Sequence, residues 1–467
     1  MTNEYPRLIV AALRGGAGKT VLSMGLIAAW RNKGLKVVPF KKGPDYIDAG
    51  WLSLAAGRPC YNLDSFLMEQ DQLLRSFTLH AGKGRVALVE GNRGLFDGMD
   101  LSGRYSTAEL AKSLIAPVVL VVDCSLVTRT SAAMVLGCQQ FDPDVEIKGV
   151  VLNRVARSRH ESIVRSSIEK YCGVPVIGAV PRQEVNVFPE RHLGLLPYEE
   201  HPATAEALAE ALKMVEANID LDKLLDVARQ AVPMKQPLRL TRKKAHSRGR
   251  RARIGVMRDS AFQFYYHENL EELTRLGATL VEISALREKK LPEIDLLYIG
   301  GGFPETHAEA LAENNEFRMS LKKAIECGLP VYAECGGFMY LGESLIFQGK
   351  TYPMVGALPV VFGFEHRPQG HGYTILEVRR PNPFFPEGSI LRGHEFHYSR
   401  VLRWKENQCH MAFSVKRGHG LDGSWDGLCH RNVLAMYTHL HALGTKGWAQ
   451  ALIQKAVSSM RLQRAMG

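Results

Sequence analysis

Short apolar runs alternate with amphipathic segments through the first half of the chain. One segment with helical periodicity begins near Lys19, directly after the first apolar run and a glycine-rich turn. Strands that alternate with helices in this way form a parallel sheet covered by helices on both faces. We therefore predict a three-layer α/β domain whose strands include RLIVAAL, KVVPF, RVALVE, APVVLVVD, EIKGVVLN and VPVIGAV.

The alternation stops at a basic segment and then restarts. Residues 235–253 hold nine Lys and Arg and no acidic residue, so the formal net charge of +11 would be +2 without them. Such a local run is typical of a solvated linker; a tether for a polyanion is the alternative. We predict a first α/β domain over 1–234, a basic linker over 235–252, and a second three-layer α/β domain over 253–467, which opens with RIGVMRDS, ATLVEIS, IDLLYIGGG and LPVYAE.

Composition narrows the setting in which the protein works. No stretch reaches the roughly 20 apolar residues that a membrane span needs, and residues 1–6 lack the order of a signal peptide. The eight cysteines are scattered without a CxxC pair, which indicates a reducing compartment. We expect a soluble cytoplasmic protein that binds neither membrane nor nucleic acid.

A glycine-rich turn with the sequence GGAGKT follows the first predicted strand and opens the first predicted helix. Backbone N–H groups at such a turn can surround phosphates, Lys19 can reach them, and Thr20 can hold Mg²⁺. Leu13 stands where the usual pattern has glycine, so the match is to a deviant form of this loop. A chance glycine-rich turn is the alternative. We predict a site for ATP formed by Arg14, Gly15, Gly16, Ala17, Gly18, Lys19 and Thr20.

Polar residues follow three of the predicted parallel strands. Acids at the carboxyl ends of such strands lie beside a nucleotide loop, and Mg²⁺ takes one or two carboxylates in addition to phosphate oxygens. We predict that Asp48 and Glu90 join Thr20 as metal ligands, whereas the alternative for any one acid is a capped turn. Asn153 is expected to pair with a base edge or to be only a turn residue.

The second domain places a thiol at a sharp turn between a strand and a helix. Cys335 follows LPVYAE and precedes two glycines, as in an elbow that exposes a nucleophile, and a helix N-terminus lowers the pKa of a thiol. A small buried apolar cysteine is the alternative. His439 is a candidate general base, or else a structural hydrogen bonder. The backbone N–H groups of an oxyanion site are expected from Gly301, Gly302 and Gly336.

Several motifs together resemble one enzyme family. YIGGGFPE, AECGGFMYL and YTHLH resemble a class I triad glutaminase domain. GGAGKT, FKKGPDYID, EGNRGLFDG, VVLNRV and FPERHLGL resemble the dethiobiotin-synthetase-like ATPase domain of cobyrinic acid a,c-diamide synthases, and GHEFHYS is similar to a further motif of that family. The resemblance covers nearly the whole chain apart from the basic segment.

The resemblance implies an ATP-dependent ligase of cobalamin biosynthesis. Cys335 would attack the side-chain amide of glutamine while His439 moves protons, and the released ammonia would displace phosphate from acyl phosphates formed at the a and c acetates of cobyrinic acid. ATP and Mg²⁺ are the implied cofactors. Guanidinium forks match carboxylates, although a surface salt bridge explains Arg191 as well. The residues expected to contact the corrinoid are Asp45, Tyr46, Asp97, Arg191 and His192.

Four points stay open. The same amidation could act on hydrogenobyrinic acid or nickel-sirohydrochlorin. From another class, Arg14 stands where partition-type switch ATPases carry a signature lysine, although such an ATPase leaves the second domain without a role. In many triad glutaminases an acid follows the base by two residues, but here His441 occupies that position, so the third triad member is undetermined. Whether the chain forms a homodimer is also left open.

Overall fold

The chain forms two compact units, Met1–Leu240 and Thr241–Gly467. The computed structural model describes residues 5–183, 190–191, 194–234, 251–405 and 407–466. Most of the basic segment predicted as a linker lies outside the described residues. None of the helices in the described part of the chain has the length and hydropathy that a membrane span needs. Each unit is an α/β fold, so the predicted fold class is confirmed.

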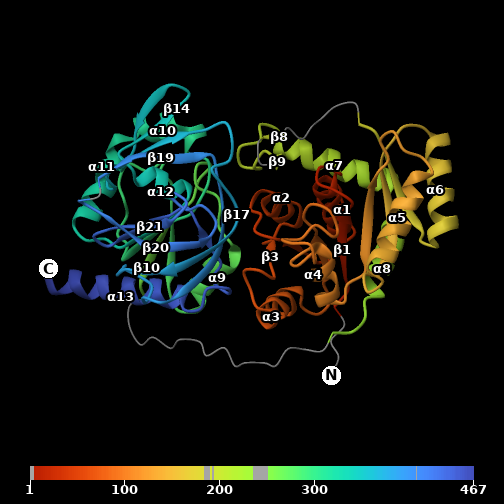
Figure 1. Cartoon of the computed structure of the whole chain (residues 1–467), viewed down its shortest axis with the longest axis horizontal. Coiled ribbons are helices and arrows are strands. Elements are labelled where there is room, and N and C mark those ends of the chain that lie inside the picture. Colours follow the sequence, from red (N-terminus) through yellow and green to blue (C-terminus); the bar gives the residue numbers. More distant parts are fainter. Residues whose placement is uncertain (1–4, 184–189, 192–193, 235–250, 406, 467) are drawn as a thin grey trace. The chain divides into compact units, whose positions relative to one another are not determined.

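A seven-stranded parallel sheet forms the centre of the first unit (Figure 1). Its strand order is β3-β2-β4-β1-β5-β6-β7, and β1 at the centre is buried along its full length. All six longer strands were predicted from their apolar runs, whereas the three-residue β3 was not. The strands are β1 (Arg7–Ala12), β2 (Val37–Lys42), β3 (Tyr61–Leu63), β4 (Val86–Glu90), β5 (Val118–Asp123), β6 (Ile147–Val155) and β7 (Val176–Pro181), with a separate hairpin of β8 (Glu190–Arg191) and β9 (Gly194–Leu195).

Two groups of helices cover this sheet. Helix α1 contacts α2, α7 and α8, while α3 contacts α4 and α5 contacts α6, as right-handed crossovers on either side of a central strand require. Because the strand order reverses direction beside β1, the loop after β1 opens at the point where such sheets bind ligands. The helices are α1 (Lys19–Asn32), α2 (Ile47–Ala56), α3 (Gln70–Ala81), α4 (Thr107–Leu114), α5 (Thr130–Phe141), α6 (Ser158–Cys172), α7 (Thr204–Asn218) and α8 (Leu221–Arg229).

The second unit contains a ten-stranded mixed sheet and a smaller four-stranded sheet. Five strands of the large sheet are parallel, in the order β11-β10-β12-β13-β22, and the remaining pairings in that sheet are antiparallel. Its strands are β10 (Arg253–Met257), β11 (Thr279–Ile283), β12 (Leu296–Ile299), β13 (Val331–Glu334), β17 (Gly370–Val378), β18 (Ile390–His397), β20 (His410–Arg417), β21 (Trp425–His430), β22 (Val433–Met436) and β23 (His439–Leu440).

The remaining elements of the second unit pack around this sheet. The small sheet has the order β15-β14-β16-β19. Two apolar clusters alternate along β13: Val331 and Ala333 belong to one, and Tyr332 to the other, as the period of a strand requires. The additional elements are α9 (His267–Arg275), the 3₁₀ helix η1 (Pro304–His307), α10 (Ala308–Glu313), α11 (Asn315–Glu326), α12 (Gly336–Leu341), α13 (Trp448–Met466), β14 (Ser344–Phe347), β15 (Lys350–Pro353), β16 (Val360–Phe364) and β19 (Ser399–Trp404).

Candidate functional site

The glycine-rich loop of the first unit turns sharply between β1 and α1. Gly16 and Gly18 have φ angles of 68° and 88°, a region that favours glycine because it has no Cβ. Lys19 folds back over the loop, and its Nζ donates hydrogen bonds to the carbonyl oxygens of Arg14 (3.2 Å) and Arg93 (2.8 Å). The lysine therefore stands at the mouth of the loop, where a phosphate would meet it.

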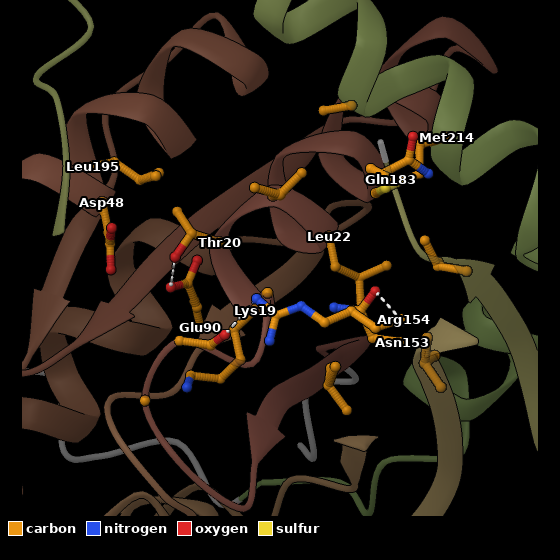
Figure 2. Close-up of a pocket in the computed structure, with 18 of the residues that line it drawn as sticks. Lys19, Thr20, Leu22, Asp48, Glu90, Asn153, Arg154, Gln183, Leu195 and Met214 are labelled. Carbon is orange, nitrogen blue, oxygen red and sulfur yellow. Dashed lines mark hydrogen bonds between the residues drawn. The ribbon is translucent and has the colours of Figure 1, made fainter. Parts of the chain in front are cut away.

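A cavity of about 800 Å³ opens beside this loop (Figure 2). The sequence-predicted residues that line it come from the glycine-rich loop and the start of α1, the segment between β2 and α2, the first turn of α2, the end of β4, and β6. They are Gly15, Gly16, Gly18, Lys19, Thr20, Asp45, Asp48, Glu90 and Asn153. Further lining residues that were not predicted include Lys41, Arg93, Arg154, Gln183, Glu210 and Met214.

A buried lysine joins the acidic residues of this cavity. Nζ of Lys41 lies 2.6 Å from Oδ2 of Asp48 and 2.6 Å from Oε1 of Glu90, and the Lys41 side chain is 1% exposed. Oγ1 of Thr20 donates a second hydrogen bond to Glu90 Oε1 at 2.9 Å (Figure 2). Lys41 is the penultimate residue of the buried strand β2, so its position in FKKGPDYID was the available sequence signal for a functional role.

Burial and mutual charge set the protonation of this cluster. Burial alone would lower the pKa of Lys41, but Asp48 and Glu90 raise it well above the usual value. Burial alone would raise the pKa of Asp48, but Lys41 lowers it. Burial and then the charge of Asp48 raise the pKa of Asp45 to about 7, and burial raises the pKa of Glu90. Asp45 can therefore exchange a proton near neutral pH.

The residues around Glu90 fit a hard cation. Oε2 of Glu90 is buried and has no hydrogen-bond partner, while Oε1 is already bound by Thr20 and Lys41. Within the described part of the chain, no group of three or more His, Cys, Asp or Glu side chains is arranged to hold a metal ion by itself. This donor set suits Mg²⁺, which takes few protein ligands and completes its shell with phosphate oxygens and water.

Two polar residues hold the loop from the side of β5 and β6. Nδ2 of Asn153 donates to the Ala17 carbonyl oxygen at 2.9 Å, so this amide supports the loop backbone, and its contact with a base edge stays a prediction. Arg14 lies 65% exposed and pairs with Asp123 at 2.6 Å, and Arg154 pairs with the same carboxylate at 2.7 Å. Arg14 is not among the residues that line the cavity.

Four further residues were predicted to contact the substrate: Tyr46, Asp97, Arg191 and His192. Asp97 Oδ2 accepts a hydrogen bond from the Gly94 amide at 2.8 Å, which is the capped-turn arrangement, and neither Asp97 nor Tyr46 lines the cavity. Tyr46 is the residue before α2. Arg191 ends the short strand β8. His192 lies outside the described residues, so its predicted contact with substrate stays a prediction.

Cys335 forms a sharp elbow between β13 and α12. Its φ and ψ angles are 46° and −102°, a strained conformation for a residue with a side chain and one found where a nucleophile is presented. The Cys335 amide donates to the Met436 carbonyl oxygen at 2.8 Å, which ties the elbow to β22. The thiol itself is almost fully buried, with the residue 5% exposed.

The prediction that the pKa of the Cys335 thiol is lowered is wrong. Burial raises the pKa of Cys335 well above the ordinary value for a thiol, and the charge of Glu305 adds to the effect. The Gly336 amide at the start of α12 acts in the predicted direction and lowers this pKa, but it is outweighed. A thiolate at this position therefore needs a positive partner that forms at the same time.

The predicted oxyanion glycines and His439 converge on the same elbow. A Cβ built on Gly301 would lie 2.4 Å from Cε1 and 3.2 Å from Nε2 of His439, so the imidazole ring packs directly against that glycine. A Cβ built on Gly336 would lie 2.9 Å from the Gly302 amide nitrogen. Because a side chain at either position would collide with its neighbour, glycine is required in both loops. The loop after β12 therefore packs against the loop that carries Cys335.

A buried polar network surrounds His439 and was not predicted from sequence. Nδ1 of His439 lies 3.5 Å from Oε2 of Glu334, and both side chains are at most 3% exposed. The His394 ring stacks on His439 with centroids 4.9 Å apart, and His394 Nδ1 is hydrogen-bonded to the Tyr266 hydroxyl at 3.0 Å. Glu334 stands in AECGG, next to the cysteine, and that adjacency was the only sequence signal.

Both units match known families of domains. Residues 8–196 match a family model described as the CobQ/CobB/MinD/ParA nucleotide binding domain, and residues 253–447 match one described as a CobB/CobQ-like glutamine amidotransferase domain. The first unit is therefore a nucleotide-binding domain, and the second is a glutamine amidotransferase domain.

Curated relatives match the two units together. The chain is 44% identical over 455 residues to a protein of Magnetococcus marinus, 42% identical over 456 residues to one of Archaeoglobus fulgidus, and 39% identical over 481 residues to one of Methanosarcina barkeri. Each alignment covers 97% of this chain and at least 96% of the relative, and each relative is named cobyrinate a,c-diamide synthase. With this identity along almost its full length, in both the nucleotide-binding and the amidotransferase unit, the chain belongs to the cobyrinate a,c-diamide synthase family.

Proposed function

We propose that the chain is a ligase that uses ATP and glutamine to amidate the a and c acetate carboxylates of cobyrinic acid. The observation that carries the proposal is the full-length similarity to proteins named for this reaction, which includes the amidotransferase unit. A partition-type switch ATPase would leave that unit, with its elbow cysteine and adjacent imidazole, without a role. The proposed product is the a,c-diamide of the macrocycle.

In the first unit, the phosphate loop and Lys19 are proposed to hold the triphosphate of ATP. Transfer of the γ-phosphoryl group breaks its bond to ADP and forms a bond to a carboxylate oxygen of the macrocycle, which gives an acyl phosphate. Thr20, Asp48 and Glu90 are the proposed ligands of Mg²⁺, which would neutralise the charge of the phosphates during transfer. Lys41 keeps two of these acids paired when no cation is bound.

Asp45 is the proposed contact for a substrate carboxylate. With a pKa of about 7 it carries a proton for part of the time at neutral pH, and a protonated carboxyl group can donate a hydrogen bond to a carboxylate. Arg191 and His192 are proposed to bind other carboxylates of the macrocycle, and Tyr46 and Asp97 to border the substrate. Arg14, Ala17 and Asn153 are proposed to support the nucleotide loop.

In the second unit, the Cys335 sulfur is proposed to attack the side-chain carbonyl of glutamine. Because burial disfavours the thiolate, the proton moves to His439 as the sulfur attacks, and the imidazolium then protonates the departing ammonia. The backbone N–H groups of Gly301, Gly302 and Gly336 are proposed to stabilise the tetrahedral oxyanion. Water releases glutamate from the thioester, and ammonia displaces phosphate from the acyl phosphate to give the amide.

The deciding experiment supplies the purified full-length chain with ATP, Mg²⁺ and glutamine and offers cobyrinic acid, hydrogenobyrinic acid or nickel-sirohydrochlorin. We expect two successive mass decreases of about 1 Da, one for each carboxylate converted to amide, with cobyrinic acid as the preferred substrate. Preference for another macrocycle would overturn the substrate assignment. Glutamine and ATP turnover without any amidated product would overturn the ligase assignment.

A further inference from the structure

A carboxylate is buried immediately before the elbow cysteine. Glu334 is the last residue of β13, and its side chain is 1% exposed. Oε1 accepts hydrogen bonds from the Tyr332 hydroxyl at 2.8 Å and the Leu440 amide at 3.1 Å, while Oε2 accepts one from the Tyr298 hydroxyl at 3.3 Å. A buried carboxylate is unfavourable unless it is hydrogen-bonded, and these three donors hold it in one position.

The two edges of the His439 ring have different neighbours. Nδ1 lies 3.5 Å from Oε2 of Glu334, whereas the Nε2 and Cε1 edge packs against Gly301. Gly302, the next residue, lies against Gly336 in the elbow that carries Cys335. The ring therefore separates the buried carboxylate from the two loops at which the thiol is presented.

We propose that Glu334 is the positioning carboxylate of the Cys335–His439 site, and that it takes the place of the acid missing two residues after the base. This inference rests on the proposed hydrolysis of glutamine at that site. Glu334 holds the proton of neutral His439 on Nδ1, so that the lone pair of the neutral ring lies on Nε2 and can accept the thiol proton. When the S–H bond breaks, its electron pair stays on sulfur, the proton binds Nε2, and Glu334 faces the imidazolium.

The other titratable groups around His439 do not fill this role. His394 stacks on the ring face, and burial, followed by the charges of His439 and His441, keeps the pKa of His394 well below its usual value. His441, at the position where many relatives of this domain class carry the acid, pairs instead with Glu268, with Nε2 and Oε2 3.7 Å apart. Tyr298 and Tyr332 bind Glu334 itself, and burial raises their pKa values.

The direct and indirect effects of Glu334 on the thiol have opposite signs. Its negative charge raises the pKa of Cys335, so by itself it opposes thiolate formation. Through His439 it does the reverse, because a carboxylate next to the imidazole stabilises the imidazolium that accompanies the thiolate. Removal of the charge at residue 334 therefore distinguishes a positioning acid from a bystander by the direction in which thiol reactivity moves.

The first experiment compares Glu334→Gln with Glu268→Gln, which removes the carboxylate of a second buried Glu–His pair, Glu268 and His441. For glutamine hydrolysis by the full chain we expect E334Q to lower kcat about 10²–10⁴-fold, as loss of the acid does in serine hydrolase triads, with the KM for glutamine changed less than threefold. E268Q is expected to keep kcat within threefold, and Glu334→Asp, which keeps the charge, to recover about tenfold over E334Q.

The pH dependence of Cys335 alkylation supplies the readout that a structural role would not move. Peptide mass spectrometry separates this thiol from the other cysteines, and iodoacetamide is the probe. In E334Q we expect the midpoint of the alkylation profile to rise. A midpoint that falls, or a kcat equal to that of the unchanged chain, overturns the proposal. Ammonium-supported synthesis should stay within twofold.

A Cys335→Ala variant separates failure of this inference from failure of the proposed function. If C335A still hydrolyses glutamine, the proposed function of the site is wrong. If C335A is inactive while E334Q is fully active, only the role of Glu334 is wrong.

A measurement on the unchanged chain tests the proposal even where Glu334→Gln does not fold. We expect the ¹⁵N spectrum of histidine-labelled protein to show His439 in the Nδ1–H tautomer when neutral, with the signal assigned by its loss in His439→Asn. A neutral His439 with its proton on Nε2 overturns the proposal.

Discussion

The cavity of the first unit and the elbow of the second unit use charge in opposite ways. Around the cavity, Lys41 and three acids form a dense set of ion pairs that faces a volume of about 800 Å³, where an ionic ligand can rearrange them. Around the elbow, Cys335 and His439 are buried, and burial raises the pKa of Cys335, which disfavours an isolated thiolate. The first site therefore presents charged groups to a ligand, whereas the second site, in the proposed mechanism, forms a charge pair only when a proton moves from Cys335 to His439.

The largest expected effect tests whether the two sites can be separated chemically. Cys335→Ala removes the proposed nucleophile, so glutamine-supported amidation should fall at least about 10³-fold, since loss of a covalent nucleophile removes most of the catalytic advantage. Amidation supplied with ammonium salts should remain within about threefold. Both rates are measured by mass spectrometry of the macrocycle; an equal loss with ammonium would show that the sites are not separable.

The next effect concerns the charge network of the first unit. Lys41→Met leaves Asp48 and Glu90 buried without their cation, and breaking a buried pair in this way costs about 3–5 kcal/mol. We expect the free energy of unfolding to fall by roughly this amount and ammonium-supported synthesis to fall with it. Urea denaturation measures the first and product formation the second.

Lys42→Met is the matched control for this substitution. Lys42 is the neighbouring buried lysine on β2, it does not line the cavity, and burial lowers its pKa. Replacing it should leave ammonium-supported synthesis within threefold. Equal losses in the two variants would mean that buried lysine in β2 serves the fold and not the cavity.

A smaller effect is expected from the packing of the second site. In Gly301→Ala the new methyl group would stand 2.4 Å from Cε1 of His439, so the ring must move. A displacement of this kind can lower the rate about 10²-fold without contact with the substrate. We expect glutamine hydrolysis to decrease about 10–100-fold and ammonium-supported synthesis to persist; an unchanged rate of glutamine hydrolysis would mean that the ring position is not critical.

The smallest expected effect is the pH dependence of stability that the ionisation of Asp45 in the first site causes. The pKa of Asp45 is about 7 in the folded chain against 3.8 for the free group, so the folded state holds the proton more tightly and loses stability as pH rises from about 4 to 7. Asp45→Asn cannot ionise. Relative to the unchanged chain it should gain about 1–3 kcal/mol in unfolding free energy at pH 8, and the gain should vanish near pH 3.5. A gain that is the same at both pH values would contradict the shifted ionisation of Asp45.

The sequence was most informative where chemistry and local periodicity coincide. Apolar runs located the six longer strands of the first sheet, and GGAGKT located the loop that lines the cavity. By contrast, the antiparallel half of the second sheet was not predicted. Its strands β17, β18 and β20 find their partners through long-range pairing, which no local pattern specifies.

Residues hidden inside apolar strands were also missed. Lys41 is the penultimate residue of β2 and Glu334 is the last residue of β13. Their partners are distant in sequence: Glu90 for Lys41 and His439 for Glu334. The predicted direction of the Cys335 pKa shift was wrong because the sequence shows the helix N-terminus, which is local, but does not show burial, which depends on the whole fold. A single sequence does not show which charged residues become neighbours when the chain folds.

The left-handed backbone conformation at Cys335 affects which residue selection would keep at this position during evolution. Glycine alone adopts a φ of 46° without a steric penalty, so a chain that obtained its nitrogen as free ammonium would no longer be selected to keep a side chain there. Drift should then favour glycine at the elbow. Such a descendant would have a higher free energy of unfolding than its ancestor and would not use glutamine. The turn between β13 and α12 would remain, with glycine in place of the cysteine.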